Sequence, residues 1–514
     1  MYHLLYLRDV PFAVATISDG RIYERAAADL VASPPFGTAP FYLQGLYAAQ
    51  LALPMAAGDF ALALLVQISL AALAWWLLYR AMRSLLGRYP AAWGIALALA
   101  HPPLAFYENK FLSASLTIVC SIGVVAAMAW TRRRDGPWPV LVVGLAAAAC
   151  VLARPNLLLA APFLAFACVL LRPSRPRSRV LAVFALGFGL GLAPMAIRNA
   201  VVTGTPTVMP AHGGGTSFYI GNNARAKGVW NPAGLFSGDV AREAEELGEA
   251  ADDAARVAAM GDELYRRAWQ EIGDDPGRWL WLLCRKAWLM IGNDELAQDF
   301  DVHGEHEMIP WANRFGVPFG VLAALAIVGA SVWWRRPDRR VDLLWVLGLA
   351  FATIAGNLVF FTSAQHRLPL AIPLCVLAAS GAPRVIALVR DRAALRGDRI
   401  VVAVALLVLA QAWWPRSRQR EPSAVHYYNL ALAYDHVGEP RAAYAAVERA
   451  LERAPDQPLM LLSRATLRRR FGDFAGARAD LDRVVASPSL PAWAREQAQQ
   501  EVDAVAIGPQ TQAR

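Results

Sequence analysis

The sequence predicts an all-α protein that crosses a membrane many times. Hydrophobic residues make up 56% of the 514 residues, and the mean hydropathy is +0.34. Soluble domains contain about 45–50% apolar residues, so this composition is unusual for them. Apolar runs long enough to cross a bilayer as helices recur along the chain. Strands do not explain such runs, because a membrane-spanning segment must satisfy its own backbone hydrogen bonds.

We count ten candidate spans. They begin near Phe60, Ala91, Phe111, Trp138, Asn156, Val180, Phe315, Val341, Leu368 and Ile400. Those at Trp138 and Ile400 are short for a bilayer, which a helix crosses in about 20 residues. The spans divide most of the chain into a first outer segment (1–59), an N-terminal membrane bundle (60–198), an outer mixed domain (199–312) and a C-terminal membrane bundle (313–414).

Arginine is distributed unevenly between the short loops. Loops 80–90, 131–137, 172–179, 335–340 and 384–399 together hold 19 Arg, whereas the opposite short loops hold three basic residues, Lys110, Arg154 and Arg367. Because basic loops remain in the cytoplasm, the arginine-rich loops are expected to be cytoplasmic. Arg416, Arg418 and Arg420 would then lie outside, against this trend, but loop 384–399 outweighs them with five Arg.

The outer segment 199–312 has the composition of a soluble domain. It carries 18 Asp and Glu against nine Lys and Arg, opposite in sign to the cytoplasmic loops. Helical patterns run from Asp239 to Ala259 and from Asp262 to Met290. The second pattern contains Trp279, Trp281 and Trp288, which is typical of a helix at the membrane interface.

Residues 423–487 contain a repeat with a period of 34 residues, and a tail (488–514) follows. Gly438 pairs with Gly472, Ala431 with Ala465, and Ala443 with Ala477. This is the tetratricopeptide period, with small residues where paired helices approach closely. The repeats are expected to bind a protein partner or, alternatively, to form a structural cap.

The sequence lacks the motifs of several kinds of enzyme. The sequence has no GKS/T phosphate loop, no GxGxxG that opens a helix after a strand, and no GxSxG to accompany the HGGG run at 212–215. The run HGEHE could present His303, Glu305, His306 and Glu307 to a metal, but an exposed polar turn is the favoured interpretation. The five cysteines lack metal-ligand spacing and are expected to be small core residues. Topology accounts for the net charge of +9, so no nucleic-acid partner is expected.

Polar side chains gather at the outer ends of the spans. The set comprises Asp19, Tyr23, Glu108, Lys110, Arg154, Asn156, Arg198, Asn199, Asn222, Asn223, Gln365, His366 and Arg367. Ionisable groups at membrane depth are costly and usually functional, although a single arginine at the end of a span can simply extend to the interface. Together the set could supply a carboxylate base and cations that hold a phosphate.

At this point the sequence resembles a known family. The ordered pieces SDGRIYERAA, FGTAPFYLQGLY, LARPNLL, LAPMAIRNAVVTGTPTVMPAHGGGTSFYIGNNARAKG and QHRLPLAIPL are similar to those of the family 39 glycosyltransferases. The resemblance covers about residues 10–385. These membrane enzymes have the GT-C fold and are related to dolichyl-phosphate-mannose protein mannosyltransferases and to the bacterial aminoarabinose transferase of lipid A. The appended repeats resemble bacterial versions with a tetratricopeptide tail.

The resemblance implies transfer of a sugar from a polyprenyl-phosphate donor to an extracytoplasmic protein, lipid or glycan, at the inner membrane of a bacterium. Asp19 matches the acidic position of the general base, and Glu108 falls near the second acidic position. Substrate binding is implied for Tyr23, Lys110, Arg198, Asn222, Asn223, His366 and Arg367, with Arg198 and Arg367 facing the donor phosphate. The sequence implies no cofactor, and a divalent metal stays an open alternative.

In one respect the sequence departs from the family pattern. Family members carry a membrane helix before the acidic loop, and MYHLLYLRDVPF is too short to be one, so that helix was lost or lies upstream of Met1. Two other functions compete with sugar transfer. A lipid or solute transporter would need polar groups at the membrane midplane and inverted repeats, and a non-catalytic scaffold would need only its repeats.

Overall fold

The computed structural model describes residues 2–57, 61–210, 214–230, 254–298, 300–309, 316–391, 395–414, 422–487 and 492–511. Within these ranges the regular structure is helical, and an isolated bridge pairs Val229 with Thr362. The described part of segment 199–312, predicted to be mixed, therefore contains helices and no strand. The span start at Phe60, His212 and Gly213 of the HGGG run, most of the pattern 239–259, and Arg416, Arg418 and Arg420 lie outside the described residues.

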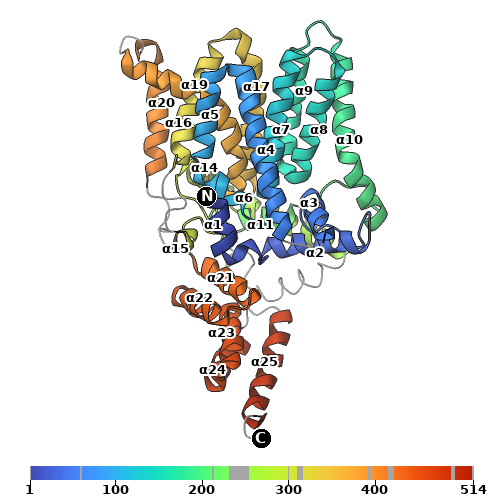
Figure 1. The fold of residues 1–514 in the computed structure, drawn as a ribbon, viewed down its shortest axis with the longest axis vertical. Helices are drawn as coiled ribbons and strands as arrows, with labels where there is room; N and C mark the ends of the chain where they lie inside the picture. The colour runs from blue at the N-terminus through green and yellow to red at the C-terminus, as the bar shows by residue number, and fades with distance from the viewer. Residues whose placement is uncertain are drawn as a thin grey trace.

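A bundle of apolar helices forms the body of the protein (Figure 1). Five helical segments, α4 (Ala61–Leu86), α7 (Ser113–Arg133), α10 (Arg177–Thr203), α17 (Arg340–Val359) and α18–α19 (Ala364–Arg390), are long and apolar enough to cross a membrane. Shorter apolar helices are α8 (Pro137–Ala153), η2–α9 (Pro155–Leu170) and α16 (Phe319–Trp334). Helices α5 (Arg88–Leu99) and α20 (Leu395–Trp413) occupy the last two predicted positions. Each predicted span is thus a helix, but in the described chain only half reach full crossing length.

Glycines bring two helix pairs into close contact. A Cβ at Gly187 of α10 would collide with the Leu141 carbonyl of α8, and one at Gly329 of α16 would collide with the Leu377 carbonyl of α19. Helix pairs in lipid are held by such close packing, because the solvent around them is as apolar as their side chains.

The arginine-rich loops meet at one end of the bundle. Arg133 donates to the Ser84 carbonyl and Arg172 to the Arg134 carbonyl, which joins the first three loops. Asp398 pairs with both Arg335 and Arg384, which joins the last two. A further ion pair, Arg132 to Asp342 at 3.3 Å, connects the two groups of loops. These contacts bring the arginine-rich loops together, and their cytoplasmic placement stays a prediction.

The opposite end of the bundle carries the shorter helices before α7 and the helices of the outer segment (Figure 1). These are α1 (Tyr2–Asp9), α2 (Asp19–Ala32), α3 (Gly45–Ala56), α6 (Pro102–Glu108), α11 (Gly215–Asn222), α13 (Ala254–Asp274), α14 (Pro276–Ile291) and α15 (Glu305–Met308). The pattern predicted as one helix from Asp262 to Met290 is two helices, because Asp275 caps α14 and Pro276 begins it. Trp281 and Trp288 of α14 are exposed, as an interfacial helix requires.

The repeat segment forms two helical hairpins beyond this same end (Figure 1). They are α21 (Ala424–His436) with α22 (Pro440–Arg453), and α23 (Pro458–Arg470) with α24 (Phe474–Val485). Gly438 and Gly472 end equivalent helices and both have φ of +81°, a conformation that favours glycine. The four paired alanines are buried, and the two predicted helix–turn–helix units are present, while their assignment as tetratricopeptide repeats stays a prediction. The predicted tail contains a further helix, α25 (Ala492–Thr511).

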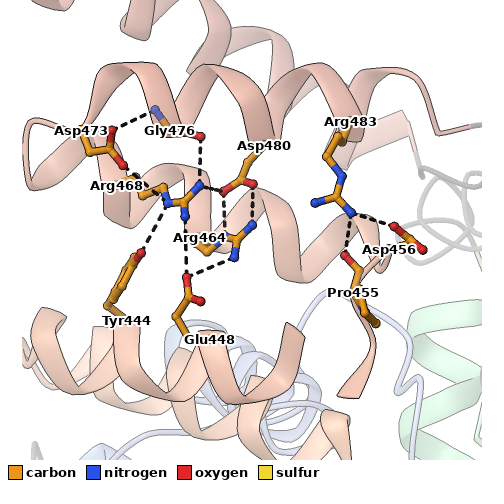
Figure 2. A network of polar contacts seen from close by, with 10 residues as sticks. All are labelled: Tyr444, Glu448, Pro455, Asp456, Arg464, Arg468, Asp473, Gly476, Asp480 and Arg483. Carbon is orange, nitrogen blue, oxygen red and sulfur yellow. Dashed lines mark hydrogen bonds and ion pairs between the residues drawn. The ribbon is translucent and has the colours of Figure 1, made fainter. Parts of the chain in front are cut away.

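An ion-pair network holds the repeats together (Figure 2). Both oxygens of the buried Asp480 carboxylate accept from Arg464, at 2.6 and 2.8 Å, and one also accepts from Arg468 at 2.9 Å. Arg464 and Arg468 both reach Glu448 of the preceding hairpin. The network thus joins α22, α23 and α24 through the guanidinium groups of Arg464 and Arg468.

Replacing Asp480 with alanine is expected to destabilise the repeats by about 2–3 kcal/mol, because two partly buried guanidinium groups lose their anion. Limited proteolysis of the full-length protein in detergent should show faster cleavage within 423–487. The matched control is Asp482→Ala, since Asp482 is an exposed partner of Arg478 on the same helix. Equal protease resistance of the two variants would contradict a stabilising network.

Candidate active site

A cavity of about 630 Å³ lies at the end of the bundle that carries α2 and the outer segment. Three of the residues that the sequence assigned to the site, Asp19, Tyr23 and His366, line it. Arg154, Asn156 and Gln365 line it as well; the sequence pointed to them as outer polar groups but gave them no role. Segments far apart in the sequence therefore contribute polar side chains to one cavity.

Asp19 is the first residue of α2, where the helix dipole stabilises a negative charge. Gly20 lets this end of the helix approach the chain at Phe111, since a Cβ there would lie 3.3 Å from the Phe111 carbonyl oxygen. Burial, assisted by the charge of Asp19, raises the pKa of Tyr42, which also lines the cavity. Asp19 thus places a carboxylate at the cavity wall beside a neutral phenol.

Arg154 brings a positive charge to the same cavity. It follows α8 directly and leads into η2, so the turn between two apolar helices holds its backbone. The residue is 9% exposed, and burial lowers the pKa of its guanidinium, while Asp19 and Tyr23 act in the opposite direction. Asp19 and Arg154 therefore bring a carboxylate and a cation to one cavity.

Tyr23 is positioned by contacts with α3 and with Gln44, the residue just before it. Its hydroxyl donates to the Gln44 side-chain oxygen, which also accepts from Ser113 Oγ at 3.3 Å. Its ring packs edge-on against Tyr47, with ring centroids 4.8 Å apart. Tyr23 is therefore a fixed part of the cavity wall.

Residues 357–366 contribute hydrogen-bond acceptors to the cavity wall. His366 stacks on Phe361 with ring centroids 4.7 Å apart. The side-chain oxygens of Asn357 and Gln365 are buried and have no hydrogen-bond partner among the residues that the structure describes. Buried acceptors without partners are costly, so these two oxygens are suited to accept from hydroxyl groups of a ligand.

Glu108 and Lys110 do not line this cavity, contrary to the predicted convergence. Glu108 accepts from Trp75 Nε1 at 2.5 Å and lies 3.3 Å from His3 Nε2. Lys110 Nζ lies 2.5 Å from Glu305, and both side chains are almost fully buried. Glu305 is therefore buried, whereas the sequence favoured an exposed polar turn.

Arg198 does not line the cavity either. Its Nε donates to the Phe36 carbonyl at 2.9 Å, its Nη2 to the Ala39 carbonyl and its Nη1 to Asn199 Oδ1 at 3.0 Å. Its guanidinium also lies over the Phe41 ring, 3.6 Å from the centroid. These partners occupy the guanidinium, and through them Arg198 holds the loop that leads to the cavity.

Arg367 is occupied in the same way. Its Nη1 donates to the carbonyls of Met290 and Gly292 at the end of α14, and its Nη2 lies 2.8 Å from Glu295. The Arg367 guanidinium therefore holds the outer segment through these contacts. Neither Arg198 nor Arg367 is placed to meet a donor phosphate in this cavity.

Asn222 and Asn223 shape the outer segment instead of touching the cavity. Asn222 Nδ2 donates to the Val359 carbonyl at 2.8 Å, while its Oδ1 accepts from Trp279 and Lys286. Asn223 caps the end of α11 by donating to the Tyr219 carbonyl. Burial lowers the pKa of the Lys286 amine to about 7, so this amine loses its proton easily. The resemblance implied substrate binding for both residues, and neither lines this cavity.

Metal ligands do not gather near this cavity. Within the part of the chain that the structure describes, there is no group of three or more His, Cys, Asp or Glu side chains that could hold a metal ion. In the HGEHE run, Glu305 and Glu307 point to other partners, Lys110 and Arg449.

No protein family model and no curated protein matches this chain. Among solved structures, it is similar to the apo crystal structure of the oligosaccharyltransferase from Archaeoglobus fulgidus, with 13% identity and a TM-score of 0.44 over 85% of this chain. The match spans 57% of that archaeal chain. A complex of the archaeal enzyme AglB with an inhibitory peptide and a dolichol-phosphate gives 13% identity and a TM-score of 0.40, over 87% of this chain and 56% of that one.

The chain is also similar to the crystal structure of ArnT from Cupriavidus metallidurans in the apo state. Identity is 14% and the TM-score 0.39, over 99% of this chain and 78% of that one. At such identities and TM-scores, these similarities by themselves assign neither a family nor a reaction to the protein.

Proposed function

We propose that this protein is a membrane glycosyltransferase of the GT-C type that moves a sugar from a polyprenyl-phosphate donor to an extracytoplasmic acceptor. The observation that carries the proposal is a single cavity that combines a carboxylate, a guanidinium and buried acceptors. A lipid phosphate that carries a sugar is amphipathic, and its head group lies where the apolar bundle meets the outer segment. Residues of α2 and α11 line the cavity, and Figure 1 shows both helices at that end of the bundle.

The reaction is a substitution at the anomeric carbon of the sugar. Asp19 takes the proton of the acceptor hydroxyl as its oxygen forms the new bond to that carbon. The bond between the carbon and the phosphate oxygen breaks, and the lipid phosphate leaves with the electron pair. Arg154 stabilises the negative charge that develops on the phosphate, because a fixed cation in a partly buried site acts strongly. Asn357 and Gln365 would accept from the sugar hydroxyls.

The proposed orientation places this cavity outside the cytoplasm. The 19 arginines of the five loops that gather at the other end of the bundle support it through the positive-inside rule. We place the protein in the inner membrane of a bacterium on the sequence resemblance. A transporter would need its polar groups at the midplane, and a scaffold would need no such cavity, so sugar transfer accounts for more of the observations.

Replacing Arg154 with glutamine is expected to weaken binding of undecaprenyl phosphate by at least about tenfold, because one charge-assisted pair is worth about 1.5–3 kcal/mol. Titration of the purified protein in detergent with undecaprenyl phosphate measures this. Arg25→Gln is the matched control, since Arg25 is an exposed residue of α2 that does not line the cavity. If both variants bind the lipid like the wild type, Arg154 has no role in holding the phosphate.

A further inference from the structure

A second cavity, of about 170 Å³, lies at the end of the bundle where the arginine-rich loops meet. It lies between the first turns of α8 and α10 and the loop that precedes α10, and both helices begin at the end away from α2 (Figure 1). Three of its lining residues are Arg172, Arg175 and Arg179, and no acidic residue lines it within the described chain. Its volume is several times the ~30 Å³ share of one water molecule, so a phosphate group fits.

Arg172 is the buried member of this group. It is 5% exposed, and its two terminal nitrogens donate to the carbonyls of Leu171 and Arg134. Its Nε has no hydrogen-bond partner in the described part of the chain. The nearest carboxylate, Asp135 Oδ1, is 4.0 Å from Nε and belongs to a side chain that is 93% exposed. A buried guanidinium with an unsatisfied N–H is costly unless an anion completes its contacts.

The other walls suit the rest of a lipid head group. Val140, Val180 and Val183 give the cavity an apolar side along α8 and α10. Trp138, in the first turn of α8, is 68% exposed, as is usual for an aromatic residue at the level of lipid head groups. Basic pockets between membrane helices on the cytoplasmic side are suited to anionic lipid head groups.

The positive-inside tendency alone does not explain this arrangement. It accounts for exposed arginines, and Arg175, Arg177 and Arg179 are all exposed, although Arg177 does not line the cavity. It does not account for an arginine that is buried with an unsatisfied donor beside two further arginines. Three positive charges around one small cavity repel each other unless an anion lies between them.

We propose that this cavity binds a phosphate group, supplied by the head group of an anionic phospholipid in the adjacent leaflet or by free phosphate. The three arginines bind the anion, and Arg172 donates its Nε to it. Occupancy neutralises the cluster and joins the start of α8 to the start of α10. The site is separate from the proposed sugar-transfer cavity and does not depend on that function.

The test is a titration of the purified full-length protein in detergent with short-chain phosphatidic acid, short-chain phosphatidylcholine and inorganic phosphate, each alone. We expect phosphatidic acid to bind, and the double variant R175Q/R179Q to weaken it at least about tenfold, through loss of two charge-assisted contacts. Arg177→Gln removes one charge from the same segment and should change the affinity by no more than about twofold. Arg172→Lys keeps the charge but removes the Nε donor, and should weaken binding severalfold.

The outcomes separate the sources of the phosphate. Binding of phosphatidic acid alone identifies a lipid ligand, and equal binding of inorganic phosphate identifies free phosphate; both support the site. If Arg177→Gln weakens binding of phosphatidic acid as much as R175Q/R179Q does, binding depends only on diffuse surface charge. That result would overturn the proposed site. Absence of binding by phosphatidic acid and inorganic phosphate, in protein whose thermal unfolding matches the wild type, would overturn it as well.

Discussion

Replacing Asp19 with asparagine is expected to lower the rate of sugar transfer by about 10²–10⁴-fold, the usual contribution of a general base. Asparagine has nearly the same shape and can still begin α2, but it cannot take the proton of the acceptor hydroxyl. Because Arg154 and not Asp19 faces the phosphate in this account, the variant should bind undecaprenyl phosphate as the wild type does. The measurement is the rate of glycan modification in cells that contain equal amounts of each protein.

The matched control is Asp9→Asn. Asp9 is an exposed carboxylate at the same end of the protein, it pairs only with its neighbour Arg8 among the contacts described, and it does not line the cavity. It should leave the rate within about twofold of the wild type, since exposed pairs contribute little. If Asp19→Asn transfers sugar as fast as Asp9→Asn, Asp19 is not the base.

Replacing Lys110 with methionine is expected to lower the free energy of unfolding by about 3–5 kcal/mol, because it leaves a buried carboxylate without its cation. Lys110 Nζ contacts Glu305 at 2.5 Å and Tyr6 Oη at 3.0 Å, and lies 4.1 Å from the Phe106 ring centroid. These contacts join the membrane bundle, the N-terminal segment and residues 300–309. Thermal unfolding of the purified protein should therefore begin at a lower temperature.

The loss of stability should extend to the repeats, because residues close to Glu305 in the chain contact them. Glu307 accepts from Tyr427 and from Arg449, and the Asp301 carboxylate accepts from the Ser423 backbone at 3.2 Å. The double variant K110M/E305L should recover most of the stability, since an apolar pair in place of a buried ion pair is often neutral or stabilising. A double variant no more stable than K110M would show that the charge imbalance is not the cause.

Features that depend on composition or local spacing were predictable from the sequence. Apolar runs gave helices at all ten predicted positions, and the clustered arginines of five loops lie together in space. The 34-residue spacing of Gly438 and Gly472 predicted two equivalent units, and in the structure both glycines have φ of +81°. Each of these signals is carried by residues close together in the chain, so no tertiary information is needed to interpret it.

The roles of single charged residues were less accessible. Arg367 follows the family pattern, but its carbonyl partners Met290 and Gly292 lie more than 70 positions earlier in the chain. Whether a guanidinium at the end of a span faces a cavity or saturates such carbonyls depends on tertiary packing. The same holds for Glu305, whose polar HGEHE run indicates an exposed turn while Lys110, 195 positions away, buries it. Arg154 was recognisable as an outer arginine between two apolar runs, yet its part in the cavity emerges only from the fold.

The central claim is that the cavity containing Asp19 transfers one sugar from a lipid phosphate to an acceptor outside the cytoplasm. Mass spectrometry of the extracytoplasmic glycans, proteins and lipids of cells that produce the wild type, Asp19→Asn or no protein tests it most directly. We predict that one acceptor carries an added sugar with the wild type, and that this sugar is absent in the other two cells. Identical acceptor masses in all three would contradict sugar transfer by this protein.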